Sequence, residues 1–387
     1  MNYRIALWSV ICALAGFLFG FDTVVISGAE QNIQTLWHLN AAIHGIAIAS
    51  ALYGTVLGAM SGGFTADHLG RRKTLLLIGV LYLIGSIWSA LANDVYGFLI
   101  ARLLGGVGIG MSTVAAPLYI SEISPPRYRG RLAGMFQFNI VFGILIAYLS
   151  NALLAGIGDS AWRWMLGVAA LPSLIYTVLT ILLPESPRWL IVQKRDLPGA
   201  RRVLALINPG ASELQIVTEA QAIKAASLTG GHSTRFWTWK LRVPIMLAFL
   251  IAFFNQLSGI NAILYFAPRI FQLAGLGSKA ALLQSVGIGV TNLVFTFIGI
   301  WLIDRLGRRT LLYIGSFGYI ASLSMVAWSF FTNHYSFVPV CIFAFIAAHA
   351  IGQGWVFARA VVEGDSKSGA NQKLPFHVIV AHGSLTD

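Results

Sequence analysis

Asp22 is an ionisable residue inside a stretch of sequence that otherwise consists almost wholly of apolar or small side chains. The stretch runs from Arg4 to Gly28 and is long enough to cross a bilayer as a helix. A carboxylate at membrane depth is costly in free energy, so such a residue usually marks the path of an ion or a substrate. The alternative is a carboxylate that a neighbour neutralises for packing alone. We therefore predict that Asp22 takes part in the movement of an ion or a substrate.

Arg102 lies in another long apolar run and is the expected partner of Asp22. A helix that runs outward and ends near Gly28 places Asp22 about 9 Å below its outer end. A helix that runs inward from near Gly97 places Arg102 about 8 Å below its own outer end. We predict that the two side chains pair when Asp22 is ionised and that protonation of Asp22 releases Arg102, which gives a switch biased by a proton. A static ion pair is the alternative.

Amide side chains gather near the middle of two further apolar runs. Gln256 lies about 20 Å from the inner end of one helix, and Asn292 lies about 18 Å from the outer end of the next. Asn255 and Asn261 are close to Gln256 in the sequence. Amides both donate and accept hydrogen bonds, which suits a neutral polyhydroxylated ligand, although hydrogen bonding between helices is the alternative. Because four amides fall within two helices, we favour a ligand site.

The helix that holds Gln256 is expected to be interrupted or bent. Gly259 and the segment 265–268, which ends in a proline, indicate such a break. Aromatic residues such as Phe19 and Tyr265 could cover the apolar face of a sugar ring. These residue types favour a carbohydrate near the middle of the membrane as the ligand.

The composition places the chain among helical membrane proteins. Of its 387 residues, 57% are hydrophobic and 10% are charged, whereas about a quarter of the residues of a soluble protein are charged. The net charge of +12 is concentrated in short connections between apolar runs, a pattern that sets orientation in a lipid bilayer and argues against nucleic acid as a partner. Cys12 and Cys341 both lie inside apolar runs and allow no disulfide framework or metal spacing.

Ten apolar runs are long enough to cross the hydrocarbon core as helices. They fall near 5–28, 43–66, 74–92, 97–121, 131–155, 162–184, 243–272, 280–303, 309–331 and 337–357. Lys and Arg cluster after the second, fourth, sixth and eighth runs, whereas the connections around 32–43, 93–96, 156–161 and 333–336 contain neither. This asymmetry predicts a multi-pass protein of the inner or plasma membrane with its N-terminus in the cytoplasm.

The chain is organised as two related halves. The segment Asp67–Leu75 recurs as Asp304–Leu311, in each case between the second and third run of its half. Such a repeat is typical of a transporter whose site lies between the halves. We expect a six-helix bundle at 1–184, a cytoplasmic linker with short amphipathic helices at 185–240, an incomplete four-helix bundle at 241–357 and a polar tail at 358–387.

Acidic and basic side chains at the expected cytoplasmic face could latch the two halves in one state. An exposed ion pair contributes only about 0–1 kcal/mol by itself, so this hypothesis requires a network. The members of the predicted cytoplasmic latch are Asp67, Arg71, Arg72, Glu122, Arg129, Glu185, Arg188, Asp304, Arg308 and Arg309.

These motifs make the chain similar to the sugar porter family of the major facilitator superfamily. The matching residues are the two Asp-x-x-Gly-Arg-Arg loops, Glu122 with Arg129, Pro184–Arg188 and Gln256–Asn261, and the resemblance covers roughly residues 5–354. It implies an all-α membrane protein built as a two-bundle transporter. Asp22 with Arg102 resembles the pair of bacterial proton-coupled symporters, which implies that a pentose or hexose moves with a proton by alternating access, without a cofactor or a metal.

The resemblance also implies which residues line the sugar site. Tyr265 is similar to an outer-gate aromatic, and Asn255 stands where the family usually has Gln, which favours a different ligand preference. The implied sugar contacts are Phe19, Gln137, Gln256, Asn261 and Asn292, and Trp355 stands in for a Trp that the family places later in the helix.

The C-terminal part departs from the family. Residues 358–387 are polar and contain no run long enough to span a membrane. We therefore expect about ten transmembrane helices, with the last two of the usual twelve missing, as in a frameshift or truncation product. The face formed by Gly54, Gly58 and Gly62 is then expected to lack its partner, the eleventh helix.

Two alternatives to an active symporter stay open. One is an inactive truncated transporter, and the other is a transporter-like sensor that binds sugar without turnover. An enzyme is not expected, because the sequence holds no set of nucleophile, base and acid and no metal cluster. The glycine-rich run at 105–110 only mimics a nucleotide-binding loop, since no strand precedes it.

Overall fold

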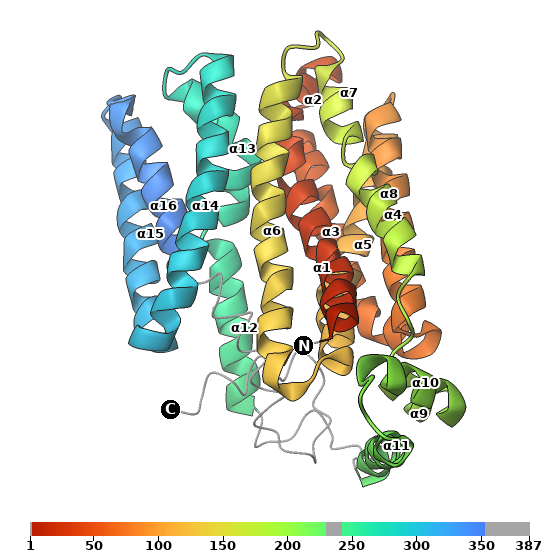
Figure 1. Ribbon diagram of the computed structural model, residues 1–387. Helices are drawn as coiled ribbons and strands as arrows, with labels where there is room; N and C mark the ends of the chain where they lie inside the picture. The colour runs from red at the N-terminus through yellow and green to blue at the C-terminus, as the bar shows by residue number, and fades with distance from the viewer. Residues whose placement is uncertain (1, 230–241, 353–387) are drawn as a thin grey trace.

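Long helices that run roughly parallel to one another make up the protein (Figure 1). The computed structural model describes residues 2–229 and 242–352, and every regular element within these residues is a helix. The helices form two groups that lie side by side in Figure 1: a first group within residues 3–181 and a second group within residues 242–352. The predicted all-α architecture is therefore confirmed.

The first group contains the six spans that the sequence predicts there. The sixth is broken near Val168, because Pro172 has no N–H to donate to the carbonyl of Val168. The helices are α1 (Tyr3–Val25), α3 (Ala41–Leu69), α4 (Arg71–Leu91), α5 (Val95–Ile123), α6 (Pro126–Leu154), α7 (Ala161–Gly167) and α8 (Ala170–Ile181), and η1 (Ile26–Gly28) and α2 (Glu30–Leu36) connect α1 to α3.

The second group is smaller. Its helices are α12 (Arg242–Leu257), α13 (Ile260–Leu273), α14 (Ser278–Leu306), α15 (Arg308–Phe331) and α16 (Val338–Gly352), and η3 (Tyr335–Phe337) precedes the last of these. Nine helical segments of the described residues are long and apolar enough to cross a membrane. The sequence predicts ten, and the difference arises at the seventh predicted span, which is divided into α12 and α13.

The end of the tenth predicted span lies outside the described residues. The structure describes this helix up to Gly352, so Trp355 and the predicted tail at 358–387 fall beyond it. The predicted loss of two further helices stays a prediction for the same reason.

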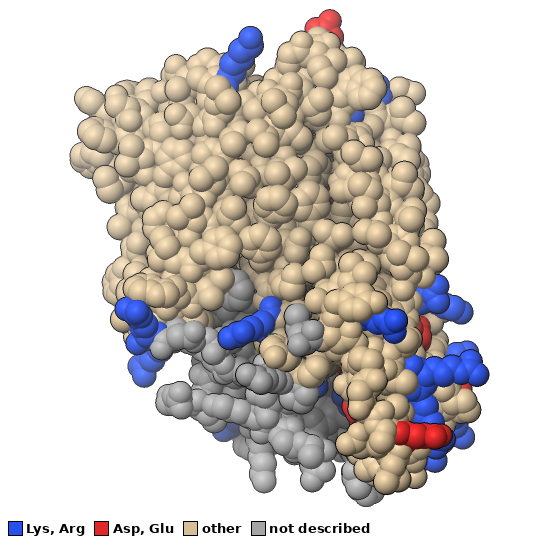
Figure 2. Space-filling model, in the orientation of Figure 1, with Lys and Arg blue, Asp and Glu red and all other residues tan. Residues whose placement is uncertain are grey.

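Basic residues and three short helices mark one end of the molecule. The segment after α8 forms α9 (Pro187–Val192), α10 (Leu197–Ile207) and α11 (Glu213–Thr229), which lie beyond the ends of the long helices in Figure 1. Most of the Lys and Arg side chains on the visible face gather at this end (Figure 2). We call it the basic end; it holds the N-termini of α1 and α4 and the C-terminus of α14. The other end of the bundle is the opposite end.

The two copies of the Asp-x-x-Gly-Arg-Arg repeat share one backbone conformation. Gly70, between α3 and α4, has φ 95° and ψ 162°, and Gly307, between α14 and α15, has φ 75° and ψ 162°. Residues that carry a side chain rarely adopt such positive φ values, so glycine is the residue that this turn requires. The repeat therefore makes the same turn between equivalent helices of each group.

Small residues allow α3 and α5 to approach each other closely. A Cβ atom added at Gly54 or Gly58 would overlap carbonyl groups of α5, and one added at Gly106 or Gly110 would overlap carbonyl groups of α3. Gly62 also faces α5. The expectation that this glycine face lacks its partner is therefore wrong. Its partner is α5 of the same group. Glycine leaves no side chain between the two helices, so their backbones pack directly against each other.

The hydrophobic core is shared between the groups at the opposite end. One cluster of buried side chains there combines Val24 and Tyr148 of the first group with Leu264, Phe271 and Phe345 of the second. A second cluster, toward the basic end, is formed by side chains of α1, α4, α5, α6 and α8 together with α10. The two groups are thus packed together at the opposite end, which leaves the protein in a conformation closed on that side.

Candidate functional site

Asp22 and Arg102 form a buried ion pair in the first group. Arg102 Nη1 on α5 donates to Asp22 Oδ1 on α1 over 2.6 Å, and Arg102 Nη2 donates to the main-chain oxygen of Asp22 over 3.3 Å. Asp22 is 8% exposed and Arg102 is 3% exposed. The contact that the depth estimate predicts is therefore present. Removing one partner of such a pair leaves a buried charge without compensation, which costs about 3–5 kcal/mol.

Two tyrosines lie near the ion pair. Tyr82 on α4 and Tyr265 on α13 are both buried and lie close enough to interact with the charges of Asp22 and Arg102. Tyr82 was not predicted from the sequence, because a tyrosine in an apolar run is indistinguishable from an ordinary core residue. Tyr265 belongs to the second group, so the surroundings of the ion pair include a residue of that group.

The helix break that the sequence predicts at Gly259 is present. α12 ends at Leu257, Gly259 has φ 80°, and α13 begins at Ile260. Asn261 Nδ2 donates to Gln256 Oε1 over 2.9 Å, so the two amides meet across the break. Gln256 is exposed, and Asn261 is half-buried. A break within a membrane helix leaves backbone groups available to a ligand, and such breaks are typical of transporter binding sites.

His349 adds an imidazole to the amide cluster. His349 Nε2 on α16 lies 3.1 Å from Asn255 Oδ1 on α12, so this ring nitrogen is the donor and orients the amide. His349 is not among the residues predicted from the sequence. Its position in an apolar run gave one signal, since an ionisable residue at membrane depth is unusual. The contact shows that the residue at 255 is held by a neighbour on another helix.

The other predicted sugar contacts lie on three further helices. Phe19 on α1, Gln137 on α6 and Asn292 on α14 are all half-buried. Helices α6 and α14 pack directly against each other, so Gln137 and Asn292 belong to helices that form the seam between the groups. No described contact joins these three side chains to Gln256 or Asn261.

Five members of the predicted cytoplasmic latch meet at the basic end. Arg71 donates to both carboxylate oxygens of Glu122 over 2.9 Å each, and to Asp67 Oδ1 over 3.0 Å. Glu185 Oε1 accepts the backbone N–H groups of Arg71 and Arg72 over 2.8 and 3.1 Å. The Arg71 side chain thus joins α4 to α3 and α5, and Glu185 joins α4 to the segment after α8.

The remaining members of the predicted latch are exposed, half-buried or outside the described side chains. Arg188 and Arg309 are exposed, and Arg309 donates to Tyr313 of its own helix over 3.5 Å. Arg129 is half-buried near the start of α6. The side chains of Asp304 and Arg308 lie outside the described structure. That these residues latch the two groups stays a prediction.

Glu185 caps the start of α4, and its titration gives a testable pH dependence. Burial raises its pKa above the ordinary value, whereas the backbone N–H groups of Ser186, Arg72 and Arg71 act in the opposite direction. Between the ordinary value and the raised one, the folded protein binds a proton that the unfolded chain has lost. The stability of the folded state therefore falls as the pH rises through this window.

We expect the melting temperature of Glu185→Gln to show less of this fall than that of the wild type. Gln keeps an acceptor oxygen for the backbone N–H groups but does not titrate, and the window begins near the ordinary value of 4.5. Melting temperatures of both proteins in detergent, measured at a series of pH values upward from 4.5, test this. Two parallel curves would contradict the role assigned to Glu185.

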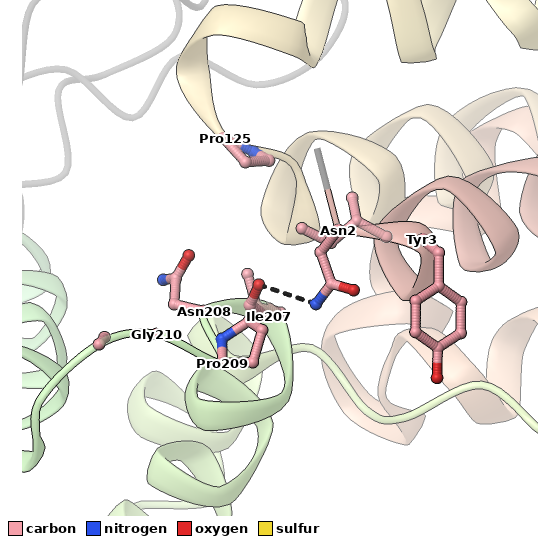
Figure 3. A pocket seen from close by; sticks show the side chains of 9 residues that line it. Asn2, Tyr3, Pro125, Ile207, Asn208, Pro209 and Gly210 are labelled. Atoms are coloured by element: carbon pink, nitrogen blue, oxygen red, sulfur yellow. Dashed lines mark hydrogen bonds between the residues drawn. The ribbon is translucent and has the colours of Figure 1, made fainter.

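A hollow at the basic end is separate from the predicted sugar contacts. It has a volume of about 790 Å³ and lies between Asn2, Tyr3, Pro125 and the turn around Pro209 (Figure 3). Asn2 Nδ2 donates to the carbonyl of Ile207, which ties the start of α1 to the end of α10. None of the residues that line this hollow is a predicted sugar contact. Among the described residues, no group of three His, Cys, Asp or Glu side chains could hold a metal ion.

A family model and several relatives match most of the chain. The family described as "Sugar (and other) transporter" matches residues 8–369, which extends past residue 354, where we expected the resemblance to end. A glucose transporter of Staphylococcus epidermidis is 38% identical over 357 residues, which cover 90% of this chain and 78% of the relative. A D-xylose–proton symporter of Escherichia coli is 32% identical over an alignment of 390 positions, gaps included. The alignment covers 91% of this chain and 78% of the relative.

Solved structures match the whole fold. The xylose transporter of Escherichia coli in a partially occluded inward-open conformation superposes with a TM-score of 0.85 at 29% identity, over 99% of this chain and 89% of that one. A major facilitator superfamily proton:xylose symporter bound to 6-bromo-6-deoxy-D-glucose superposes with a TM-score of 0.80 at 29% identity, over 99% of this chain and 86% of that one.

Proposed function

We propose that this chain, which belongs to the sugar transporter family and has the major facilitator fold, moves a monosaccharide across the cell membrane together with a proton. The similarity to a glucose transporter and to arabinose–proton and D-xylose–proton symporters supports this assignment. The observation that carries the proton part is the buried Asp22–Arg102 pair. The proposal covers hexoses and pentoses, because amides accept the hydroxyl groups of either.

Asp22 is the proposed proton carrier. Its Oδ1 accepts from Arg102, and its Oδ2 makes no hydrogen bond within the described residues. Protonation removes the charge that holds Arg102, so the pair separates. Because Tyr265 of α13 lies near both residues, this change reaches the second group. The proton therefore biases how the two groups pack, which is the coupling that symport requires.

The sugar is proposed to bind near the break between α12 and α13. Gln256 and Asn261 present their paired amides there, and His349 orients Asn255 beside them. Gln137 and Asn292 contribute from the seam, and Phe19 and Tyr265 contribute aromatic faces. The basic end is proposed to face the cytoplasm, in accordance with the distribution of Lys and Arg. The closed core at the opposite end then corresponds to a protein that faces inward.

Uptake of radiolabelled glucose, xylose and arabinose into vesicles tests the proposal. Uptake should be fastest when the outside is acidic, slower without a pH gradient and slowest when the inside is acidic. Uptake that ignores the gradient would reject symport. Binding of sugar without any uptake would reject transport and favour a sensor or an inactive protein.

We expect Gln256→Ala to weaken sugar binding by about tenfold. This corresponds to the loss of about one hydrogen bond to the sugar, together with the loss of the acceptor for Asn261 Nδ2. The dissociation constant, measured with labelled sugar on purified protein, tests this. Gln193→Ala is the matched control, because Gln193 is an exposed amide after α9 that contacts no predicted sugar residue. Equal affinities of the two variants would remove Gln256 from the site.

A further inference from the structure

Glu30 is a buried carboxylate that lies between the two groups at the opposite end. Its side chain, in the first turn of α2, is 0% exposed. Arg269 of α13 donates through Nε to Glu30 Oε1 over 2.9 Å and through Nη2 to Gln34 Oε1 over 2.6 Å. Glu30 and Gln34 belong to the first group and Arg269 to the second, so this ion pair crosses from one group to the other.

His44 lies beside the carboxylate on the side of the first group. His44 Nε2 on α3 lies 3.1 Å from Glu30 Oε2 and 3.1 Å from the main-chain oxygen of Glu30. Both atoms are acceptors, so this ring nitrogen carries a hydrogen. The ring of Phe266 on α13 packs against His44 at 6.0 Å and against the Arg269 guanidinium at 6.0 Å. His44 thus ties the main chain of Glu30 to its own group, while the carboxylate pairs with Arg269.

The ion pairs formed by Arg71 and by Arg269 differ. At the basic end, Arg71 pairs with Asp67 and Glu122, all within the first group. At the opposite end, Glu30 pairs with Arg269 across the groups, at the same end as the shared hydrophobic core. When the groups separate there, the buried carboxylate loses Arg269. An ion pair that is broken while one partner stays buried is strongly unfavourable, so this contact favours the closed arrangement.

We propose that Glu30, His44 and Arg269 form a latch at the opposite end, which keeps that side closed and must open in every cycle. The inference rests on the alternating access of the proposed function. Arg269 and Glu30 are positioning residues in this role, because they act on the packing of the groups and not on the sugar or the proton. His44 keeps the carboxylate aligned for Arg269.

Distances between spin labels across the opposite end test the latch. Cys12 and Cys341 are first replaced by Ala, and labels are attached to cysteines introduced at Leu36 and Leu273. Both positions are exposed, at 51% and 62%, and they lie on α2 and α13. The wild type should give mainly a short distance. Arg269→Gln should raise the ratio of the longer-distance to the shorter-distance population by about thirtyfold, the least that removal of a partner from a buried pair predicts.

Two further variants make the result specific. Arg163→Gln is the matched control, because Arg163 also lies at the opposite end but donates within the first group, to the carbonyl of Ala90 over 2.8 Å and to Asn93 over 3.2 Å. It should leave the distances unchanged. The double variant Glu30→Gln with Arg269→Gln leaves no buried charge without a partner, so it folds even if Arg269→Gln does not. It should also shift the distances toward the longer population.

Unchanged distances in the double variant would overturn the latch, as would an equal shift in Arg163→Gln. These outcomes are independent of the proposed substrate and proton. If the distances shift but the wild type transports no sugar, the latch stands and the proposed function fails. If uptake follows the proton gradient but the distances do not respond, the proposed function stands and the latch fails.

Discussion

Asp22→Asn is expected to abolish proton-driven accumulation of sugar while it leaves sugar exchange intact. Asn cannot release or take up a proton and, like protonated Asp22, carries no charge to hold Arg102, which Asp22 contacts over 2.6 Å. For a symport of one proton with one sugar, a gradient of about two pH units sustains about 100-fold accumulation, since each unit is a factor of ten. The variant should instead equilibrate sugar to about the same concentration on both sides.

Two measurements on the same vesicles separate coupling from binding. Accumulation of labelled sugar under an outside-acidic gradient reports coupling, and exchange of labelled for unlabelled sugar without a gradient reports binding and movement. Asp159→Asn is the matched control, because Asp159 is an exposed acid in the connection between α6 and α7. Asp22→Asn vesicles that still accumulate sugar would show that another group carries the proton.

Gly58→Ala is expected to destabilise the protein by about 1–3 kcal/mol, although it adds a single methyl group. The added Cβ atom would overlap the main-chain oxygen of Val107 on α5, and neither backbone can yield without moving its helix. The effect opposes the intrinsic preference of helices for Ala over Gly, which favours Ala by about 1 kcal/mol. The net result should be a lower melting temperature and a smaller yield of monodisperse protein.

Gly63→Ala provides the control for this prediction. Gly63 lies on the same helix, and no atom lies within 4 Å of the position where its Cβ would be. Here the helix preference acts alone, so the melting temperature should stay the same or rise. Thermal unfolding of both variants in detergent measures the difference. A Gly58→Ala protein as stable as Gly63→Ala would contradict the close packing of α3 on α5.

Several features of the site were predictable because they depend on position along a helix. The shared depth of Asp22 and Arg102 follows from the rise per residue, and the structure places the two side chains in contact. The break near Gly259 follows from residue types that interrupt a helix, and it is present. The repeat around Gly70 and Gly307 was expected between the second and third span of each half, and it lies between α3 and α4 and between α14 and α15.

Other features required the arrangement of the helices in space. The partner of the glycine face was assigned to a helix of the other half, whereas it is α5. Tyr82 has no local signal that distinguishes a site residue from a buried one, and His349 stands out only as an ionisable residue in an apolar run. Each acquires a role through its neighbours. The pairing of Glu30 with Arg269 joins residues far apart in the sequence, and no repeat or motif marks it.

The sequence by itself determined that this chain crosses a membrane as helices, which of its ends is basic and how deep its ionisable residues lie. These properties are local, because a helix in lipid satisfies its backbone within its own segment and its length sets its depth. The tertiary structure alone decided which helix faces meet and on which side the two groups are joined. Those choices depend on the packing of side chains between distant segments, and a transporter must be able to make them in more than one way.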